Sequence, residues 1–180
     1  RGKRKALPAV DGFRWVTHNT KNGGTSILID ETTIPDNNFK ILQHPTTHSS
    51  GIEIKIKRRT VRIINVYLPV YKGKSNIIKH RKSLENLGRS ISKNCIVLGD
   101  WNGWIPDYNN GRSNSHGAHI ETFAAEHDLT ILPIEKWERT RFDHRGNGST
   151  VDYILTKNVS TTKIEIASDI QGTDHRPLST

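Results

Sequence analysis

Three short segments place acidic, amide and imidazole side chains where a folded chain could use them for chemistry. In the first, the apolar run Val97–Gly99 leads directly into Asp100, Trp101 and Asn102. A strand that delivers an Asp and an Asn at its carboxyl end places both in the crevice where α/β sheets usually bind ligands. Asp and Asn are also common turn residues, so this segment alone is equally compatible with a structural turn.

The second segment is Ser149–Leu155, in which Asp152 interrupts an apolar run. Burying a carboxylate is costly unless it is paired or hydrogen-bonded. One interpretation is an edge strand with Asp152 in water. The other is a carboxylate that orients a histidine or binds a metal.

The third segment, Thr173–Leu178, places Asp174 and His175 side by side in a turn that Pro177 ends. Histidine is the side chain best matched to general acid–base work near neutral pH. A solvated turn would explain the dipeptide as well.

Tyr67 completes the set of candidate residues. It shares one strand face with Asn65, opposite Val66 and Leu68. A buried tyrosine normally packs and satisfies its hydroxyl, but near a phosphate the same hydroxyl can donate a hydrogen bond or perturb a water.

The elements that must hold these segments are short strands and two helices. Ile52, Ile54 and Ile56 alternate with charged residues, which is the period-two pattern of a half-buried strand. Val61–Leu68 is apolar on both faces, as in a central strand, and a basic turn predicts that it pairs with the preceding strand as a hairpin. Further strands are expected at Gly24–Asp30, Cys95–Gly99, Thr130–Leu132, Val151–Leu155 and Lys163–Ala167.

The first helix is expected over Ser75–Lys93 because apolar residues recur on one stripe. This stripe consists of Ile77, Leu84, Leu87 and Ile91. The apolar face of the second helix consists of Ile120, Phe123, Ala124 and His127. Between the helices, Gly103–Gly117 is rich in Asn, Gly, Ser and Pro and is expected to be a loop. His116 and His119 are spaced like metal ligands, but no acid or cysteine completes a set, so solvated histidines in a loop are favoured.

Length and composition favour one folded domain, and the basic charge is compatible with nucleic-acid binding without establishing it. A chain of 180 residues can bury one core, and no apolar run approaches the length of a membrane span or a signal peptide. The single cysteine, Cys95, excludes an internal disulfide and favours a reducing compartment, the cytoplasm or nucleus. Lys and Arg number 27 against 18 Asp and Glu, and the net charge of +9 attracts polyanions. The basic residues cluster at Arg1–Lys5, Lys55–Arg62, Lys79–Lys82 and Arg139–Arg145.

Together these segments resemble the endonuclease/exonuclease/phosphatase superfamily, which includes DNase I and the abasic-site endonucleases, and especially the endonuclease domain of non-LTR retrotransposons. The motifs in the family's order are Asn65–Pro69, Gly99–Asn102, Ser149–Tyr153 and Thr173–His175. Gly23–Ile27 is similar to the family's early glycine-led strand. The resemblance runs from about Asp11 to the end, and it implies a two-sheet α/β sandwich flanked by helices, with residues 1–180 as a single domain.

By this resemblance the chain is a Mg²⁺- or Mn²⁺-dependent endonuclease that nicks DNA, with RNA as the alternative nucleic acid and no membrane partner. Asp100 would orient or deprotonate the attacking water, and Asn102 would hold the scissile phosphate. Asp174 would contact the metal. His175 would bind a phosphate oxygen in the transition state, with Asp152 fixing its ring. Phosphodiester hydrolysis needs such charge neutralisation and a positioned water, and hard oxygen ligands favour Mg²⁺ or Mn²⁺ over zinc.

The remaining residues implied by the resemblance surround this centre. Tyr67 would bind phosphate or assist the attack. Thr140 and Thr173 are candidates for lining the site, and Arg139 and Arg141 for the basic rim that holds DNA.

The sequence departs from the family pattern in three ways, one of which is that the chain stops directly after the Asp174–His175 turn, so the closing strand is expected to be clipped. The family's metal-binding Glu lies on a strand before the segment that resembles Asp11–Phe13, so the first strands and that Glu are expected to be absent, and an N-terminal truncation is expected. Trp101 replaces the usual Phe between Asp100 and Asn102. These departures leave two alternatives open: a non-catalytic nucleic-acid-binding remnant of the same fold, and a phosphoesterase acting on a lipid headgroup.

Overall fold

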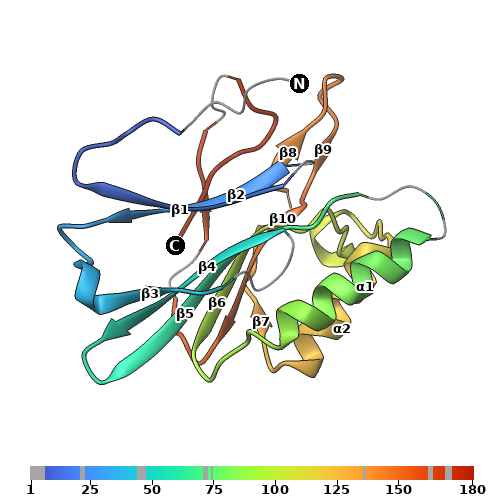
Figure 1. Ribbon diagram of the computed structural model, residues 1–180. Coiled ribbons are helices and arrows are strands. Elements are labelled where there is room, and N and C mark those ends of the chain that lie inside the picture. Colours follow the sequence, from blue (N-terminus) through green and yellow to red (C-terminus); the bar gives the residue numbers. More distant parts are fainter. Residues whose placement is uncertain are drawn as a thin grey trace.

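A computed structural model describes residues 7–20, 23–43, 48–70, 73, 75–135, 137–161, 164–168 and 172–180. The basic cluster Arg1–Lys5 lies outside the described residues. A six-stranded sheet in the order β3-β4-β5-β6-β10-β7 forms the centre (Figure 1). Its strands are β3 (Phe39–Ile41), β4 (Ser49–Ile56), β5 (Arg59–Tyr67), β6 (Cys95–Asp100), β7 (Thr130–Ile131) and β10 (Asp152–Lys157).

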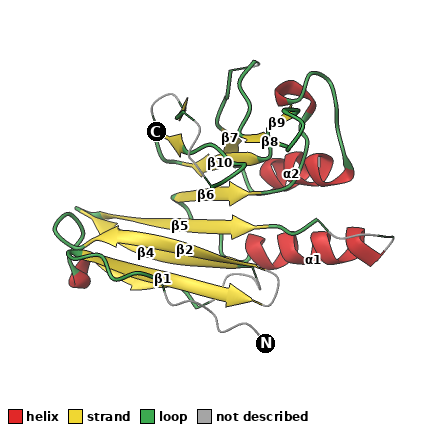
Figure 2. Cartoon of the chain, turned by 90° about the horizontal axis from the view of Figure 1, so that it is seen from above, coloured by secondary structure: helices red, strands yellow, loops and turns green. Residues whose placement is uncertain are grey.

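The central sheet is antiparallel except between β5 and β6, which run parallel. Helix α1 (Ser75–Gly88) makes the crossover between these two strands, and α2 (Ser115–Glu126) follows β6. Both helices cover the same face of the sheet (Figures 1 and 2). The predicted hairpin of β4 and β5 is confirmed, and β5 is a central strand as expected.

The second layer is the hairpin of β1 (Phe13–Thr20) and β2 (Gly23–Asp30). It packs on the sheet face opposite the helices, where Val16 and Ile29 meet Ile52 and Ile54 in a small core. The larger core lies on the helix face and includes Leu84 and Leu87 of α1, Ile120 and Phe123 of α2, and Val66, Val97 and Leu155 of the sheet. The expected two-sheet α/β sandwich with flanking helices is therefore confirmed.

Two short 3-10 helices, η1 (Asp36–Asn38) and η2 (Pro106–Tyr108), and two short strand pairs complete the described structure. The β8–β9 hairpin joins β8 (Arg141–Phe142) to β9 (Gly148–Ser149), and β11 (Glu165–Ile166) pairs with β12 (Leu178–Ser179). Within the described residues neither helix has the length and apolar character to cross a bilayer.

Two helix predictions were partly wrong. Helix α1 ends at Gly88, so Ile91 lies beyond it, and Ile77 is 45% exposed rather than buried. Helix α2 begins inside the segment predicted as a loop, because the side chain of Asn114 accepts a hydrogen bond from Gly117 N and caps it. His116 and His119 therefore lie on this helix, and His116 is buried rather than solvated.

Candidate active site

The sheet brings Asp100 and Asp152 together directly. Asp100 is the last residue of β6, Asp152 is the first residue of β10, and the two are opposite each other in the antiparallel register. Tyr67, the last residue of β5, is the parallel neighbour of Asp100 on the other side. The ends of three adjacent central strands thus supply two carboxylates and a phenol.

All three side chains belong to the sheet face that carries the β1–β2 layer. Val66, Leu68 and Val97 are buried in the core under the helices, and side chains alternate between the two faces of a strand. Asn65, on the same face as Tyr67, donates its side-chain amide to the Ser26 carbonyl of β2 over 2.9 Å. The site therefore lies opposite the helices, at the edge of the β1–β2 layer.

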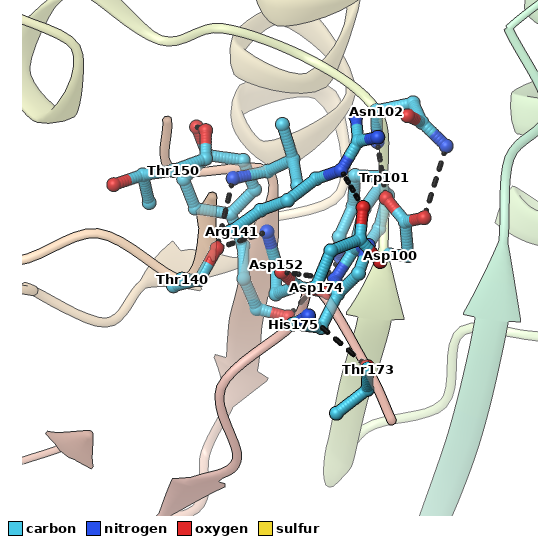
Figure 3. Close-up of polar contacts among 12 residues, drawn as sticks. Asp100, Trp101, Asn102, Thr140, Arg141, Thr150, Asp152, Thr173, Asp174 and His175 are labelled. Atoms are coloured by element: carbon cyan, nitrogen blue, oxygen red, sulfur yellow. Dashed lines mark hydrogen bonds and ion pairs between the residues drawn. The ribbon is translucent and has the colours of Figure 1, made fainter. Parts of the chain in front are cut away.

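Asp100 is held by the turn that follows it. The side-chain amide of Asn102 donates to Asp100 Oδ2 over 3.0 Å and its backbone N–H donates to Oδ1 over 3.0 Å (Figure 3). This arrangement requires a left-handed backbone at Asn102, with a φ of 49°, which asparagine tolerates better than most residues. The same amide also contacts the Leu68 carbonyl over 3.1 Å.

Gly99 allows this strand end to lie close to β5. Its φ is 135°, and a Cβ there would lie 2.0 Å from the Val66 carbonyl oxygen. Any side chain would push β5 and β6 apart at the point where Tyr67 and Asp100 are neighbours. Glycine at position 99 is therefore a packing requirement of the site.

Asp152 binds the histidine of the Asp174–His175 turn. His175 Nδ1 lies 3.0 Å and 3.1 Å from the two carboxylate oxygens of Asp152, the contact that the sequence predicts. The hydrogen bond to Asp152 raises the pKa of His175. In contrast, burial and the like charge of Asp152 raise the pKa of Asp100 to about 6. One carboxylate thus stabilises an imidazolium, while its neighbour accepts a proton more readily than an exposed aspartate.

Asp174 has a partner that sequence reasoning did not assign. Arg141 Nε lies 2.8 Å from Asp174 Oδ2, and this hydrogen bond lowers the pKa of Asp174 (Figure 3). The Asp174 side chain is still 50% exposed, and its other oxygen lies 3.9 Å from His175 Nε2. Arg141 therefore pairs with Oδ2 of Asp174, while among the described residues Oδ1 makes no contact as close as that one.

Thr140 lies beneath the site rather than in its lining. The side chain is fully buried, and its hydroxyl accepts hydrogen bonds from Val151 N over 3.1 Å and Asp152 N over 3.2 Å. Its carbonyl accepts a bond from Arg176 N over 2.7 Å. The structure thus places the Thr140 side chain below the site, where it connects the start of β10 to the Asp174–His175 turn.

The remaining candidates lie around this centre. Thr173 is exposed, and its hydroxyl accepts the backbone N–H of His175 over 3.0 Å, which shapes the turn. Tyr67 is half-buried with His48 edge-on to its ring, at a centroid distance of 6.3 Å. Arg139 lines a hollow beside the site, and Arg141 lines both that hollow and the one that contains His175.

The donor set suits a hard, largely hydrated cation. Asp100, Asp152, Asp174 and Asn102 offer oxygens and no thiolate, which matches Mg²⁺ or Mn²⁺. Burial, and then the like charge of Asp152, raise the pKa of Asp100, and a bound cation would favour its ionised form. Among the residues that the structure describes, however, no three His, Cys, Asp or Glu side chains are arranged to share one ion. Asp174, whose side chain is 50% exposed, is the carboxylate that would hold such an ion.

The model of the endonuclease–reverse transcriptase family matches residues 61–179. The endonuclease domain of TRAS1, a telomere-specific non-LTR retrotransposon, is 17% identical with a TM-score of 0.70, over 94% of this chain and 77% of that chain. An AP endonuclease from Archaeoglobus fulgidus is 18% identical with a TM-score of 0.58, over 93% and 78%. D. rerio TDP2 complexed with single-strand DNA product is 13% identical with a TM-score of 0.57, over 93% and 75%.

A search of curated proteins gave no match. The structural similarities establish the fold, and the family match spans the segments that contribute Tyr67, Asp100, Asp152 and His175. The chain belongs to the endonuclease–reverse transcriptase family, within the DNase I-like superfamily of nucleases and phosphoesterases.

Proposed function

We propose that this chain hydrolyses the phosphodiester backbone of DNA with the help of a divalent metal ion and cuts one strand of a duplex. The observation that carries the proposal is the contact of Asp152 with His175, at 3.0 Å, directly beside Asp100 on the neighbouring strand. This geometry provides an acceptor for the proton of an attacking water and a donor for a phosphate oxygen within one site.

Asp100 is the proposed base. With a pKa of about 6 its carboxylate is mostly ionised at neutral pH yet accepts a proton more readily than an ordinary aspartate. Asn102 restrains both oxygens of this carboxylate and so sets its direction toward the water. The second role of Asn102 is to contact the scissile phosphate.

His175 is the proposed donor to the phosphate. Asp152 holds its Nδ1 and raises its pKa, which favours the protonated ring, whose Nε2–H can donate to a phosphate oxygen. A protonated donor aimed at developing negative charge stabilises the transition state more than the ground state. Tyr67 and Arg141 add a phenol and a guanidinium at the rim.

Asp174 would hold the metal ion through Oδ1, because Arg141 pairs with Oδ2. When bound, Mg²⁺ or Mn²⁺ supplies charge neutralisation at the phosphate and at the leaving oxygen. Support for DNA as the substrate comes from the net charge of +9 and from the arginines around the site.

A second function, nucleic-acid binding without hydrolysis, is favoured by one observation. Asp174 is already paired with Arg141, and the described part of the chain offers no cluster of three acidic, His or Cys side chains for an ion. One carboxylate holds Mg²⁺ weakly because this ion gives up its hydration shell reluctantly.

Relaxation of supercoiled plasmid distinguishes the two functions. The wild-type chain should nick DNA in Mg²⁺ and not in EDTA, and D100N and H175N should abolish nicking while still binding DNA. Asp128, an exposed aspartate paired with Lys157, provides the control D128N, which should nick normally. DNA binding without nicking in Mg²⁺ or Mn²⁺ would establish the binding function instead, and an RNA substrate in parallel tests the choice of nucleic acid.

A further inference from the structure

A pocket of about 540 Å³ lies between the β4–β5 turn, the segment before β6 and the residue that follows β10. We call it the basic pocket. It is lined by Glu53, Arg58, Arg59, Thr60, Ser92, Lys93, Asn94 and Asn158. Strands β5 and β6 both begin at this pocket and end at Tyr67 and Asp100. The basic pocket is therefore at the opposite end of the sheet from the active site, and in Figure 1 the β4–β5 turn is at the lower left whereas the β8–β9 hairpin is at the upper right.

The distance between these two ends means that a ligand in the basic pocket is not the phosphate at the active site. Strand β5 runs from Arg59 at the pocket to Tyr67 at the active site, which is about 26 Å at ~3.3 Å per residue. The two ends also face in opposite directions, and a DNA duplex stays straight over this length because its persistence length is ~150 base pairs. A duplex that crosses the active-site end therefore cannot also cross the basic pocket.

The positive charges of the basic pocket are not used by the fold. Arg58, Arg59 and Lys93 are exposed, and none of them forms an ion pair within the part of the chain that the structure describes. The one acidic residue of the lining is Glu53. Its two carboxylate oxygens are paired with Arg62 Nε at 2.9 Å and Lys40 Nζ at 3.4 Å. The lining therefore keeps three cationic side chains for an anionic ligand.

Hydrogen bonds join the three segments that carry these cations. Arg62 N donates to the Asn94 carbonyl over 3.0 Å, and the side-chain amide of Asn94 donates to the Thr60 carbonyl over 2.9 Å. The side-chain amide of Asn158 donates to the Lys93 carbonyl over 2.6 Å. The backbone that carries the cations is thus held in place before a ligand arrives, which lowers the entropy cost of binding.

The backbone phosphates of a nucleic acid fit this lining. Guanidinium groups bind phosphate oxygens through paired hydrogen bonds, and an ammonium adds a point charge. The lining contains no apolar or aromatic residue. It therefore offers neither a surface on which a base can stack nor a side chain that can insert into a bilayer. Recognition of this kind reads phosphates and not base sequence.

We propose that the basic pocket is a second nucleic-acid site, in which Arg58, Arg59 and Lys93 bind the backbone of a segment other than the one at the active site. The proposal goes beyond hydrolysis and does not require it. It gives a function to the basic cluster Lys55–Arg62, which the active site does not use. With one site at each end of the sheet, a single chain holds two nucleic-acid segments at once.

Capture of one DNA by another tests the proposal, because bridging requires two sites. A short duplex is attached to beads, the protein is added in EDTA so that cleavage does not contribute, and a fluorescent short duplex follows. The wild type should retain the fluorescent duplex, and retention should fall as salt rises. In R58Q/R59Q/K93Q retention should fall at least about 10-fold, because three phosphate contacts are lost. Single-stranded RNA in place of the fluorescent duplex compares two sources of the same phosphate chemistry.

A matched variant separates the basic pocket from the overall charge. K79Q/R81Q/K82Q removes three exposed cations of α1 and should capture DNA as the wild type does. All the substituted positions are exposed, so both variants should unfold in urea at the wild-type midpoint. No capture by the wild type, equal losses in the two variants, or capture that persists in R58Q/R59Q/K93Q would overturn the proposal. Binding to phosphatidylserine vesicles that R58Q/R59Q/K93Q loses, with DNA capture unchanged, would assign the pocket to a membrane instead.

The outcomes are independent of the proposed nuclease activity. R58Q/R59Q/K93Q should cut a short duplex in Mg²⁺ at the wild-type rate, because the substituted residues lie at the other end of the sheet. Bridging by a chain that never cuts would retain the second site and remove the nuclease. Cutting without bridging would retain the nuclease and remove the second site.

Discussion

Asp100 and Asp152 occupy directly opposed positions on β6 and β10, so two carboxylates face each other across one strand pair. Like charges in this position destabilise a sheet unless something offsets them. His175 offsets the charge of Asp152 at 3.0 Å, and Asn102 donates two hydrogen bonds to Asp100. The repulsion between the two carboxylates therefore lowers the stability of the fold locally, and these contacts offset it while keeping the reactive groups close together.

The raised pKa of Asp100 predicts how activity depends on pH. Because the ionised carboxylate is the proposed base, the nicking rate should rise as pH increases through about 6, the pKa of Asp100. Removing the like charge with D152N should lower this pKa and move the acidic limb to lower pH, even though the overall rate falls. Nicking rates between pH 5 and pH 8 measure both effects, and an acidic limb at the ordinary aspartate pKa in the wild type would contradict the assignment.

Two substitutions of Thr140 distinguish the contribution of its hydroxyl to stability from the contribution of its methyl group. T140V leaves the N–H groups of Val151 and Asp152 without their acceptor, which should cost about 2–4 kcal/mol of unfolding free energy. T140S keeps the hydroxyl and should cost less. Urea denaturation measures the difference, with T122V on the exposed face of α2 as the control. Equal losses in T140S and T140V would show that the methyl group, not the hydroxyl, is what matters.

Arg141 should contribute to DNA affinity through charge. Its side chain is 40% exposed, and it lines both hollows. R141A should weaken binding to DNA and reduce the slope of log affinity against log salt by about 1, because one phosphate contact is lost. Filter binding across a salt series measures the slope. K82A, at an exposed position on α1, is the control, and an unchanged slope in R141A would exclude the contact.

The buried histidine cluster predicts how stability depends on pH. His80 is completely buried, stacks on His116 at a centroid distance of 3.9 Å, and lies 3.3 Å from His119 between Nδ1 atoms. Burial, followed by the charges of His116 and His119, lowers the pKa of His80 to about 3. The unfolded chain therefore binds a proton near pH 6.5 that the folded chain does not, so stability is lost as pH falls from about 6.5 toward 3.

Substitution of His80 by leucine tests this dependence. The unfolding free energy of the wild type should fall between pH 7.0 and pH 5.5, and in H80L the fall should be smaller by about 1 kcal/mol. Chemical denaturation at the two pH values measures it, with H144L on the exposed hairpin as the control. An identical fall in H80L and the wild type would place the proton uptake elsewhere.

The central strands were predictable because their signals are local. Period-two alternation in β4 and the apolar runs before Asp100 and around Asp152 all mark buried strands, and the structure pairs them. Helix boundaries were harder. The composition around Asn114 predicts a loop although this residue caps α2, and Gly88 ends α1 where an added Cβ would lie 2.5 Å from His127 Nε2. That contact is tertiary and leaves no local pattern.

The residues of the site could be predicted from the sequence, but the neighbouring residues that hold them in position could not. Asp100, Asp152 and His175 converge as the motif order implies. The pairing of Arg141 with Asp174 spans 33 residues, and the buried position of Thr140 depends on how the hairpin, β10 and the final turn meet. Trp104 belongs to none of the motifs, and only the folded chain places it on the same hollow as Trp137.

The most direct test of the account is a double-mutant cycle on the Asp152–His175 contact, read out as the rate of plasmid nicking in Mg²⁺. If Asp152 acts by holding His175, H175A should lower the rate by at least about 10²-fold, and D152A should lower it substantially. The double variant should then be no slower than H175A alone, because residues that act as a unit are not additive. Losses that multiply in the double variant, or nicking that survives all three substitutions, would contradict the account.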